Sequence, residues 1–417
     1  MRCRAIGHGA GVLSLLLSSA CGSGSDGASS SAGAGGAPAT AGTTGNSAGS
    51  GDHGGAATAN GGSSNSNGGA GNDQAGSAST PGESPTVAGC AILPSNHIFN
   101  TPIDSLPAHG SSSDFMKAVG THNIHLDLGT TVDPTSDEYY GIPYNVVHGK
   151  TVAWQNALYT TADPDLDWDP TEESDCALGT DHMLASPCTG AAATKAQFPV
   201  PTTPLVEGGI VTDPAQPYGD HHLLLLDADA CSLWELYHVY PGSQGGWDIF
   251  GSAYFDLKSN ALRPAGWTSA DAAGFPIMPL LIRADEASSG TIRHALRFTI
   301  ESSKIRAEYT WPARHLTGNA TSASLPPMGQ AFRIKSSYVI PSKFNTQSRA
   351  IIQALKTYGM YLADGGSSMY IQGEPSANWE DDTFSQVQSV SSSEFEAVDF
   401  GPIAARPGFD PNSAAVP

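Results

Sequence analysis

The sequence predicts a mainly β protein, a β-sandwich or barrel of the jelly-roll type with a few short helices. Apolar residues recur mostly at every second position, which is typical of strands with one buried face. The chain also contains 48 Gly and 29 Pro residues, which separate short strands by frequent turns. Helical periodicity is confined to two segments. This combination favours packed sheets with small helical additions.

Paired strands are indicated at three places. The clearest alternation places Leu296, Phe298 and Ile300 on one side of a strand and Arg297 and Thr299 on the other. Each expected β-hairpin joins two such runs through a short turn. The three pairs are residues 294–301 with 306–311, residues 221–226 with 233–240, and residues 360–363 with 369–372.

The two predicted helices are Ser113–Val119 and Gln347–Tyr358. In the longer one, Ile351 and Leu355 lie on one stripe. Gly359 follows at the position where a glycine commonly ends a helix.

The amino terminus has the pattern of a bacterial export signal of the lipoprotein type. Residues 1–20 combine a basic start with a short apolar run, and Cys21 follows small residues. One departure is Ser18, which stands where lipoprotein signals usually have Leu. We expect lipidation of Cys21, with plain secretion as the alternative. The predicted location is the outer membrane or cell surface through a lipid anchor, or the medium.

A low-complexity segment separates this signal from the rest of the chain. Residues 22–86 contain no aromatic residue, no Leu, Ile, Val or Met, and no Lys or Arg. Such a segment cannot bury enough apolar surface to offset its chain entropy. We therefore expect a disordered stalk over residues 21–86 and a single large β-rich domain over residues 87–417.

The charge balance restricts the partners of the protein. The chain carries 40 Asp plus Glu against 19 Lys plus Arg. Nucleic acid is excluded as a partner because phosphate neutralisation needs a basic face. Neutral polysaccharide or a cell-surface glycan fits better, and seven Trp and 13 Tyr suit stacking on sugar rings unless they belong to the core. We expect a monomer that contacts membrane only through its lipid.

Four cysteines follow the stalk, an even number that implies disulfides in an exported protein. We expect Cys90 to pair with Cys231 and Cys176 to pair with Cys188. Zinc is the competing interpretation, but the chain has no Cys-x-x-Cys and no close Cys/His pair.

Eight segments after the stalk form a recognisable pattern. They are Phe99–Asp104, Tyr140–Asn145, Glu207–Gly209, Gly219–His222, Asn260–Pro279, His294–Thr299, Trp311–His315 and Leu355–Ser367. This pattern resembles a family of exported soil-bacterial proteins. The resemblance covers nearly all of the region after the stalk, and it implies no activity. In comparison with that pattern, residues 169–195 look like an insertion, so the Cys176–Cys188 bond within them is expected to be local reinforcement.

The hairpin of residues 220–240 carries the most suggestive chemistry. With a two- or four-residue loop, His222 lies opposite Tyr237 and Leu224 lies opposite Glu235. One face then offers a proton donor and a proton acceptor together, with Asp220 nearby. Two alternatives stay open: His222 and Glu235 satisfy each other inside the sheet, or another loop length shifts the register.

A second candidate group lies in one loop. Trp267 could stack on a sugar, Arg263 could donate hydrogen bonds to it, and Asp271 could act as an acid or base. Alternatively, Ser269 caps a short helix whose first turn favours Asp271.

Weaker candidates complete the set. Glu207 is either a catalytic carboxylate or a solvated acid, and Asp364 has the pattern of a turn residue more than of a catalyst. Tyr144 and Asn145 are candidate substrate-binding residues. His294 alternates with apolar residues and is expected to be a core histidine.

No cofactor and no metal are expected, with one weak exception. Residues 163–169 place an aspartate at every second position, as at the start of a calcium loop. Trp168 replaces the turn-forming glycine, and Ser174 replaces the final bidentate glutamate. The remainder of the chain has no metalloprotease, NTPase or dinucleotide motif in a suitable context.

Two function classes follow. The first is a surface-tethered extracellular carbohydrate-active enzyme, either a lyase that uses His222 and Tyr237 or a polysaccharide hydrolase. The hydrolase would use a carboxylate pair drawn from Glu207, Asp220, Glu235 and Asp271. The alternative is a non-catalytic surface lipoprotein that binds glycan or has a structural role.

Overall fold

The computed structural model describes residues 83–160, 169–210, 219–243 and 245–417. These residues form a mainly β, sandwich-like fold with a few short helices, as the sequence predicts. Within these ranges each sheet is open, and none closes into a barrel. Three larger sheets build the fold, and the predicted signal peptide, Cys21 and most of the predicted stalk lie outside the described residues.

The central sheet has the strand order β13-β10-β9-β4. Its strands are β13 (Gly251–Asp256), β10 (Ser232–Tyr237), β9 (Leu223–Asp227) and β4 (Tyr144–Val147). Successive leucines of β9 face opposite sides: Leu224 belongs to one hydrophobic core and Leu225 to another. Both faces of this sheet are therefore buried, which explains the uninterrupted leucine run in β9.

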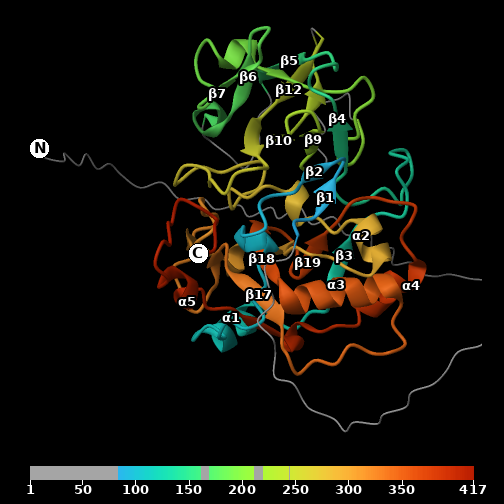
Figure 1. Ribbon diagram of the computed structural model, residues 1–417, viewed down its shortest axis with the longest axis vertical. Helices are drawn as coiled ribbons and strands as arrows, with labels where there is room; N and C mark the ends of the chain where they lie inside the picture. Colours follow the sequence, from blue (N-terminus) through green and yellow to red (C-terminus); the bar gives the residue numbers. More distant parts are fainter. Residues whose placement is uncertain (1–82, 161–168, 211–218, 244) are drawn as a thin grey trace, which may run out of the picture. The chain divides into compact units, whose positions relative to one another are not determined.

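The second sheet covers one face of the central sheet. It has the order β11-β12-β5-β8-β6-β7 and lies in the upper part of Figure 1. Trp234 and Leu236 of the central sheet pack with Phe198 and Ile249 of this sheet in the smaller core. Its strands are β11 (Tyr240–Pro241), β12 (Trp247–Ile249), β5 (Gln155–Tyr159), β8 (Gln197–Phe198), β6 (Cys176–Leu178) and β7 (Met183–Ala185).

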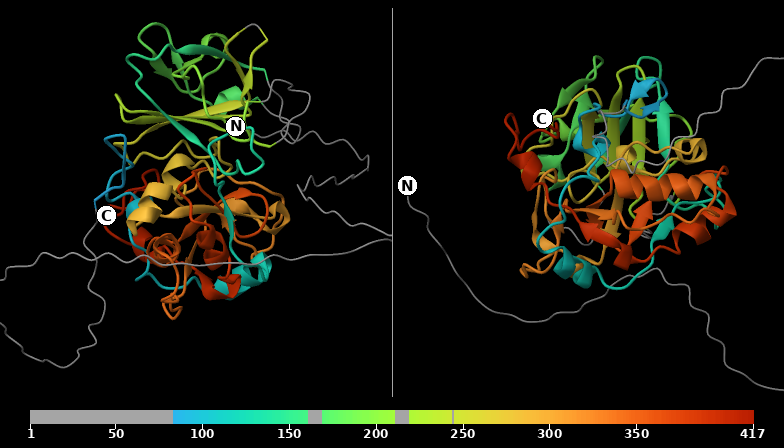
Figure 2. Two further views of the ribbon diagram at one scale, coloured as in Figure 1. Left: turned by 90° about the vertical axis from the view of Figure 1, so that its right-hand side faces the viewer. Right: turned by 60° about the horizontal axis from the view of Figure 1, so that its bottom comes forward.

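The third sheet lies on the other side of the central sheet, as Figure 1 and the left-hand view of Figure 2 show. Its order is β20-β17-β18-β14-β19-β3. The pair β14–β18 is parallel, β14–β19 is antiparallel, and β19–β3 is parallel. Its strands are β20 (Phe395–Ala397), β17 (Ala331–Ile334), β18 (Met360–Gly365), β14 (Leu296–Ile300), β19 (Tyr370–Gln372) and β3 (His125–Asp127).

The shorter elements join these sheets. Two small pairs consist of β1 (Thr86–Val87) with β2 (Cys90–Ala91), and of β15 (Arg306–Tyr309) with β16 (Pro327–Met328). The 3₁₀ helices are η1 (Ile98–Asn100), η2 (Pro170–Glu173), η3 (Ala193–Lys195), η4 (Met278–Leu280), η5 (Ser302–Lys304) and η6 (Ser392–Glu394).

The described residues contain both predicted helices, α1 (Ser112–Val119) and α3 (Thr346–Thr357). Asn345 caps the start of α3 by accepting a hydrogen bond from the backbone of Ser348 at 2.8 Å. Gly359 has φ +72°, and a Cβ at this position would lie 2.5 Å from the carbonyl oxygen of Phe332. Only glycine fits there without strain.

Three further α-helices were not predicted from the sequence. They are α2 (Ala284–Ser289), α4 (Asp381–Val387) and α5 (Gly401–Ala404). Each is too short to show a clear helical period. Among the described residues, no helix has the length and apolar character needed to cross a membrane.

One of the three predicted hairpins forms. Strands β9 and β10 pair antiparallel around a four-residue turn, with Leu224 opposite Glu235. The other two predictions are wrong. Strand β14 lies between β18 and β19, which separates the third predicted pair, and β15 pairs with β16 instead of β14. Parallel pairing between segments distant in the sequence determines which strands are neighbours here. Turn signals within a short segment do not indicate such pairing.

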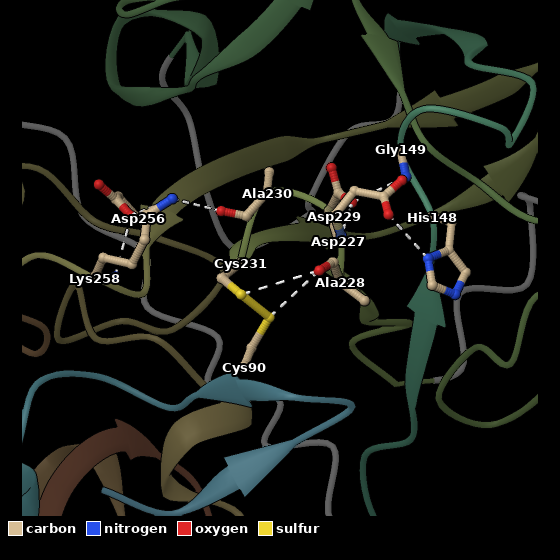
Figure 3. The surroundings of a disulfide bond; sticks show 10 residues. All are labelled: Cys90, His148, Gly149, Asp227, Ala228, Asp229, Ala230, Cys231, Asp256 and Lys258. Carbon is tan, nitrogen blue, oxygen red and sulfur yellow. Dashed lines mark hydrogen bonds and ion pairs between the residues drawn. A yellow bond between two sulfur atoms is a disulfide. The ribbon is translucent and has the colours of Figure 1, made fainter.

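Both predicted disulfides are confirmed. Cys176, the first residue of β6, bonds to Cys188 in the segment after β7. Cys90 of β2 bonds to Cys231 in the β9–β10 turn. Figure 3 shows the second bond between the β2 strand and that turn, where both sulfurs approach the carbonyl oxygen of Ala228. Two disulfides are typical of a protein that folds in an oxidising, extracellular environment.

Candidate functional site

Two adjoining cavities lie where the start of β9 meets the third sheet. The first has a volume of about 270 Å³ and the second about 220 Å³. Both are lined by Asp220, Asp364 and Gly365, so they adjoin at these residues, and we call the two cavities together the acidic cleft. Further carboxyl groups line each part: the first cavity adds Glu173 and Asp271, and the second adds Asp127 and Glu207.

Elements far apart in the chain supply these groups. Asp220 and His222 lead into β9, and Glu207 precedes them in the loop after β8. The third sheet contributes Arg297 from β14 and Asp364 from β18. The cleft therefore depends on the packing of the β9–β10 hairpin against the third sheet.

His222 is held by both of its ring nitrogens. Nε2 lies 2.8 Å from the carbonyl oxygen of Ala270, to which it donates, and Nδ1 lies 2.6 Å from Oε2 of Glu207. Burial opposes protonation of this ring, but the charge of Glu207 and its hydrogen bond raise the pKa of His222 to about 9. Although burial acts against it as well, the same contact lowers the pKa of Glu207. The two side chains form an ion pair at neutral pH.

Asp271 lines the first cavity and does not start a helix. Its Oδ2 accepts a hydrogen bond from Nε of Arg297 at 3.1 Å, and its Oδ1 accepts one from the backbone of Ala273 at 3.2 Å. The hydroxyl of Ser269 donates instead to the carbonyl oxygen of Phe275 at 2.6 Å. Asp271 is therefore fixed as the partner of a buried guanidinium.

Asp364, like Asp220, lines both cavities. Its Oδ2 accepts a hydrogen bond from the backbone of Ala272 at 3.2 Å. Burial and the negative charge of Asp271 raise the pKa of Asp364 to about 7, and the positive charge of Arg297 opposes this rise only in part. Asp364 consequently keeps its proton as the pH approaches 7 from below and loses it above that pH.

Negative charge also accumulates in the second cavity. Burial and the neighbouring Glu207 raise the pKa of Asp127 to about 6, and Arg297 counteracts this rise. Asp127 lies opposite Gln372 in the β3–β19 pair, and both line the cavity.

The structure does not place Glu235 in the cleft. Its side chain is completely buried, and Oε1 accepts hydrogen bonds from the backbones of Ile277 at 2.8 Å and Met278 at 2.9 Å. Burial raises the pKa of Glu235 to about 7 despite these hydrogen bonds. Glu235 thus anchors the start of η4 against β10, and His222 is not its partner.

Arg263 and Trp267 also lie apart from the cleft. The guanidinium of Arg263 forms a buried ion pair with Asp175 at 2.5 Å. It also lies 5.4 Å from the ring centre of Trp267. Neither residue lines the two cavities of the cleft. Nε of Arg263 donates to the carbonyl oxygen of Thr268 at 2.6 Å and so holds the loop that carries Asp271.

Tyr237 keeps the predicted position next to His222, with 5.4 Å between ring centres. It lines the first cavity, and its hydroxyl donates to Oδ1 of Asp220 at 3.4 Å. Asn145 does not reach the cleft; its amide donates to the carbonyl oxygen of Leu205 at 2.9 Å. Tyr144 packs against the larger core. Asn145 therefore supports the loop that leads to Glu207.

Two remaining candidates have structural positions. His294 is fully buried, and its Nε2 lies 2.9 Å from Oε2 of Glu286, in keeping with a core histidine. The aspartate-rich loop proposed for calcium lies outside the described residues apart from Asp169, which caps η2 by accepting from Thr171.

Sequence reasoning missed the contributions of Arg297, Asp127 and Gln372 to the cleft and underrated Asp364. The sequence gives little indication that Arg297 belongs to a buried site, because a charged residue on the polar side of a strand normally points to solvent. In this structure both faces of β14 are covered, and Arg297 is buried.

One group of side chains has the composition of a metal site. Glu207, Asp220 and His222 each offer a ligand atom, and these atoms lie within 4.8 Å of one another.

Comparisons with known proteins add no assignment to this geometry. No family of known proteins, no curated protein and no solved structure matches the chain.

Proposed function

We propose that the protein is an extracellular carbohydrate-active enzyme that hydrolyses a neutral polysaccharide in the acidic cleft. The observation that carries this proposal is the presence of two carboxyl groups of different character on the same cavity walls. Burial and the negative charge of Asp271 raise the pKa of Asp364 to about 7. Burial raises the pKa of Asp220 as well, but the charge of His222 opposes this rise, and Asp220 is exposed where Asp364 is half-buried. Glycoside hydrolysis needs this division between an acid and a base.

The roles follow from these surroundings. Protonated Asp364 donates its proton to the leaving glycosidic oxygen. Asp220 accepts a proton from the water that attacks the sugar carbon. Tyr237 donates a hydrogen bond to Asp220 and keeps this carboxylate directed into the cavity.

The lining of the cleft favours an uncharged substrate. Four carboxyl side chains and one guanidinium line the second cavity, and that guanidinium already pairs with Asp271. An anionic polymer would be repelled. Tyr237 and Phe250 in the first cavity offer apolar surface to the faces of a sugar ring.

A hydrolase fits better than a lyase that uses His222. A lyase base must accept a proton from the substrate, and both ring nitrogens of His222 already contact protein oxygens, at 2.8 Å and 2.6 Å. The export signal, Cys21 and the low-complexity stalk support a lipid-anchored location for the enzyme on the cell surface.

The test is a screen of the purified chain against neutral and anionic polysaccharides, with assays for new reducing ends and for the absorbance of unsaturated products. We expect reducing ends from a neutral polymer and no unsaturated product. Asp364→Asn and Asp220→Asn should each lower turnover by about 100-fold or more. Asp256→Asn is the matched control, because Asp256 is an exposed carboxylate outside the cleft.

The outcomes separate the alternatives. Glycan binding without turnover would support the non-catalytic surface protein instead. Unsaturated products would support a lyase. Turnover that survives both cleft substitutions would remove the assigned roles of Asp364 and Asp220.

A further inference from the structure

We propose that Glu207, Asp220 and His222 bind one divalent transition-metal ion at the wall of the second cavity. The sequence offers no metal motif at this place, because the loop carrying Glu207 and the residues before β9 are separated in the chain. The fold brings their ligand atoms together.

The spacing of the three groups suits a shared ion. One ligand atom from each lies within 4.8 Å of the others. Atoms bound to one ion at about 2.0–2.2 Å in tetrahedral geometry are about 3.3–3.6 Å apart. Side-chain movements of about 1 Å therefore bring all three atoms into coordination distance.

The backbone already holds two of these ligands against each other. The backbone N–H of Glu207 donates to the carbonyl oxygen of His222 at 3.0 Å. The N–H of His222 donates in return to Oε2 of Glu207 at 3.3 Å. A metal ion would meet a preorganised pair, so binding would not have to order a loose loop.

His222 has the outer contact that metal-binding histidines commonly have. Its Nε2–H donates to the carbonyl oxygen of Ala270 at 2.8 Å, which fixes the orientation of the ring. Nδ1 is thereby directed toward Glu207, 2.6 Å from Oε2. In the metal-free protein a proton lies between these two atoms, and a metal ion would take its place.

An independent observation also indicates a ligand in this cavity. The amide oxygen of Gln372 is buried and accepts no hydrogen bond within the part of the chain that the structure describes. Its side chain is 7% exposed and lines the same cavity as the three proposed ligands. A buried carbonyl oxygen without a donor is costly unless an ion or an ordered water satisfies it.

The charge of the cavity favours a cation. Asp127 and Asp364 add carboxyl groups to those of Glu207 and Asp220, and Arg297 is the sole Lys or Arg among the described lining residues. The charge of Arg297 is compensated by Asp271, with 3.1 Å between Nε and Oδ2.

The donor set selects the kind of ion. One imidazole nitrogen and two carboxylates suit Zn²⁺ or Mn²⁺, whereas Ca²⁺ and Mg²⁺ prefer oxygen ligands throughout. Three protein ligands leave a coordination position open toward the cavity for water or substrate. A water bound at that position would be activated inside the cavity that Asp364 also lines.

The metal site stands independently of glycan hydrolysis, because binding can be measured without substrate. The full chain is freed of metal with chelator and titrated calorimetrically with ZnCl₂, MnCl₂ and CaCl₂ in separate experiments. We expect one site per chain for Zn²⁺ or Mn²⁺, much weaker binding of Ca²⁺, and a higher melting temperature with the bound ion.

Variants locate the ion. Asp220→Asn should weaken binding by at least about tenfold, and this exposed residue can be changed without opening the core. Glu207→Gln should have a similar effect. His148→Gln is the matched control, because His148 pairs with Asp229 at 3.2 Å on the surface, outside the cleft, and binding should not change.

Three results would overturn the proposal. They are the absence of Zn²⁺ and Mn²⁺ binding to a chain with a normal melting transition, unchanged binding in both Asp220→Asn and Glu207→Gln, and a preference for Ca²⁺. Metal binding without any glycan turnover would support the site and count only against the proposed hydrolysis.

Discussion

Asp271 and Arg297 form an ion pair in which both side chains are buried, with exposures of 0% and 3%. Nε and a terminal nitrogen of the guanidinium each lie 3.1 Å from Oδ2 of the carboxylate. The pair joins the loop before η4 to β14 and forms part of the wall between the cleft and the core. It therefore has a structural role in addition to its place beside Asp364.

Removing one partner of this pair should be strongly destabilising. Arg297→Met leaves the carboxylate of Asp271 buried without its counter-charge, and we expect a loss of about 3–5 kcal/mol in the free energy of unfolding. Urea unfolding measures it. Lys258→Met is the control: Lys258 and Asp256 form an exposed pair at 3.7 Å, which should contribute less than about 1 kcal/mol. Equal effects of the two substitutions would contradict the structural role of the buried pair.

The two disulfides should differ in their contribution to stability. Cys90 and Cys231 are 141 residues apart, and Cys176 and Cys188 are 12 apart. Because a longer closed loop restricts the unfolded chain more, replacing both cysteines of the long-range bond by serine should cost about 5 kcal/mol, against about 3 kcal/mol for the short-range bond. Denaturant unfolding without reductant compares the two double variants. A larger loss for the short-range bond would show that native contacts, and not chain entropy, decide.

Glu235 should make the protein less stable as the pH rises. Its pKa is about 7 in the folded protein, against an ordinary value of 4.5 for a glutamate. Between pH 4.5 and pH 7, Glu235 loses its proton in the unfolded chain but keeps it in the folded protein. Because the folded state binds more protons in this range, the free energy of unfolding falls as the pH rises. The expected fall is up to about 3 kcal/mol from pH 4.5 to pH 7.

The Glu235→Gln variant tests this assignment, because its amide does not titrate. Its stability should decline less than that of the parent protein over the same pH range in denaturant titrations. The exposed Glu172→Gln variant is the control and should keep the parental slope. Parallel curves for the parent protein and Glu235→Gln would assign the pH dependence to other groups.

The proposed role of Asp364 predicts an alkaline limit of activity. As an acid with a pKa of about 7, Asp364 should lose its proton as the pH rises through neutrality, and kcat/KM should fall accordingly. The charges that act on it come from Asp271 and Asp220, which raise this pKa, and from Arg297, which lowers it. A pH profile of kcat/KM on the substrate found in the screen measures the limit. Activity that stays constant well above neutral pH would exclude Asp364 as the acid.

The β9–β10 hairpin shows what local sequence can predict. Its turn signal and alternating pattern indicated that Leu224 lies opposite Glu235, and the structure has this register. The same reasoning could not predict where the carboxylate of Glu235 is directed. Its hydrogen-bond donors belong to Ile277 and Met278, at the start of a 3₁₀ helix that no local pattern brings next to β10.

Asp364 shows the opposite error. Its Asp-Gly-Gly context is typical of a turn, so the sequence favoured a local role. Its position in the cleft depends on the parallel pairing of β14 with β18, in which Leu296 lies opposite Met360. Parallel neighbours are joined by long connections, so the residues that surround Asp364 cannot be identified from its own segment.

The bond between Cys90 and Cys231 also has a mechanical consequence. When the chain is pulled at its two ends, tension reaches Cys90 and passes through the sulfur atoms directly into the β9–β10 turn (Figure 3). The intervening residues carry no load, and at roughly 3.4 Å per residue a separation of 141 residues amounts to about 480 Å of chain that cannot be drawn out. Asp127, Glu207 and Asp220 all lie within this shielded stretch.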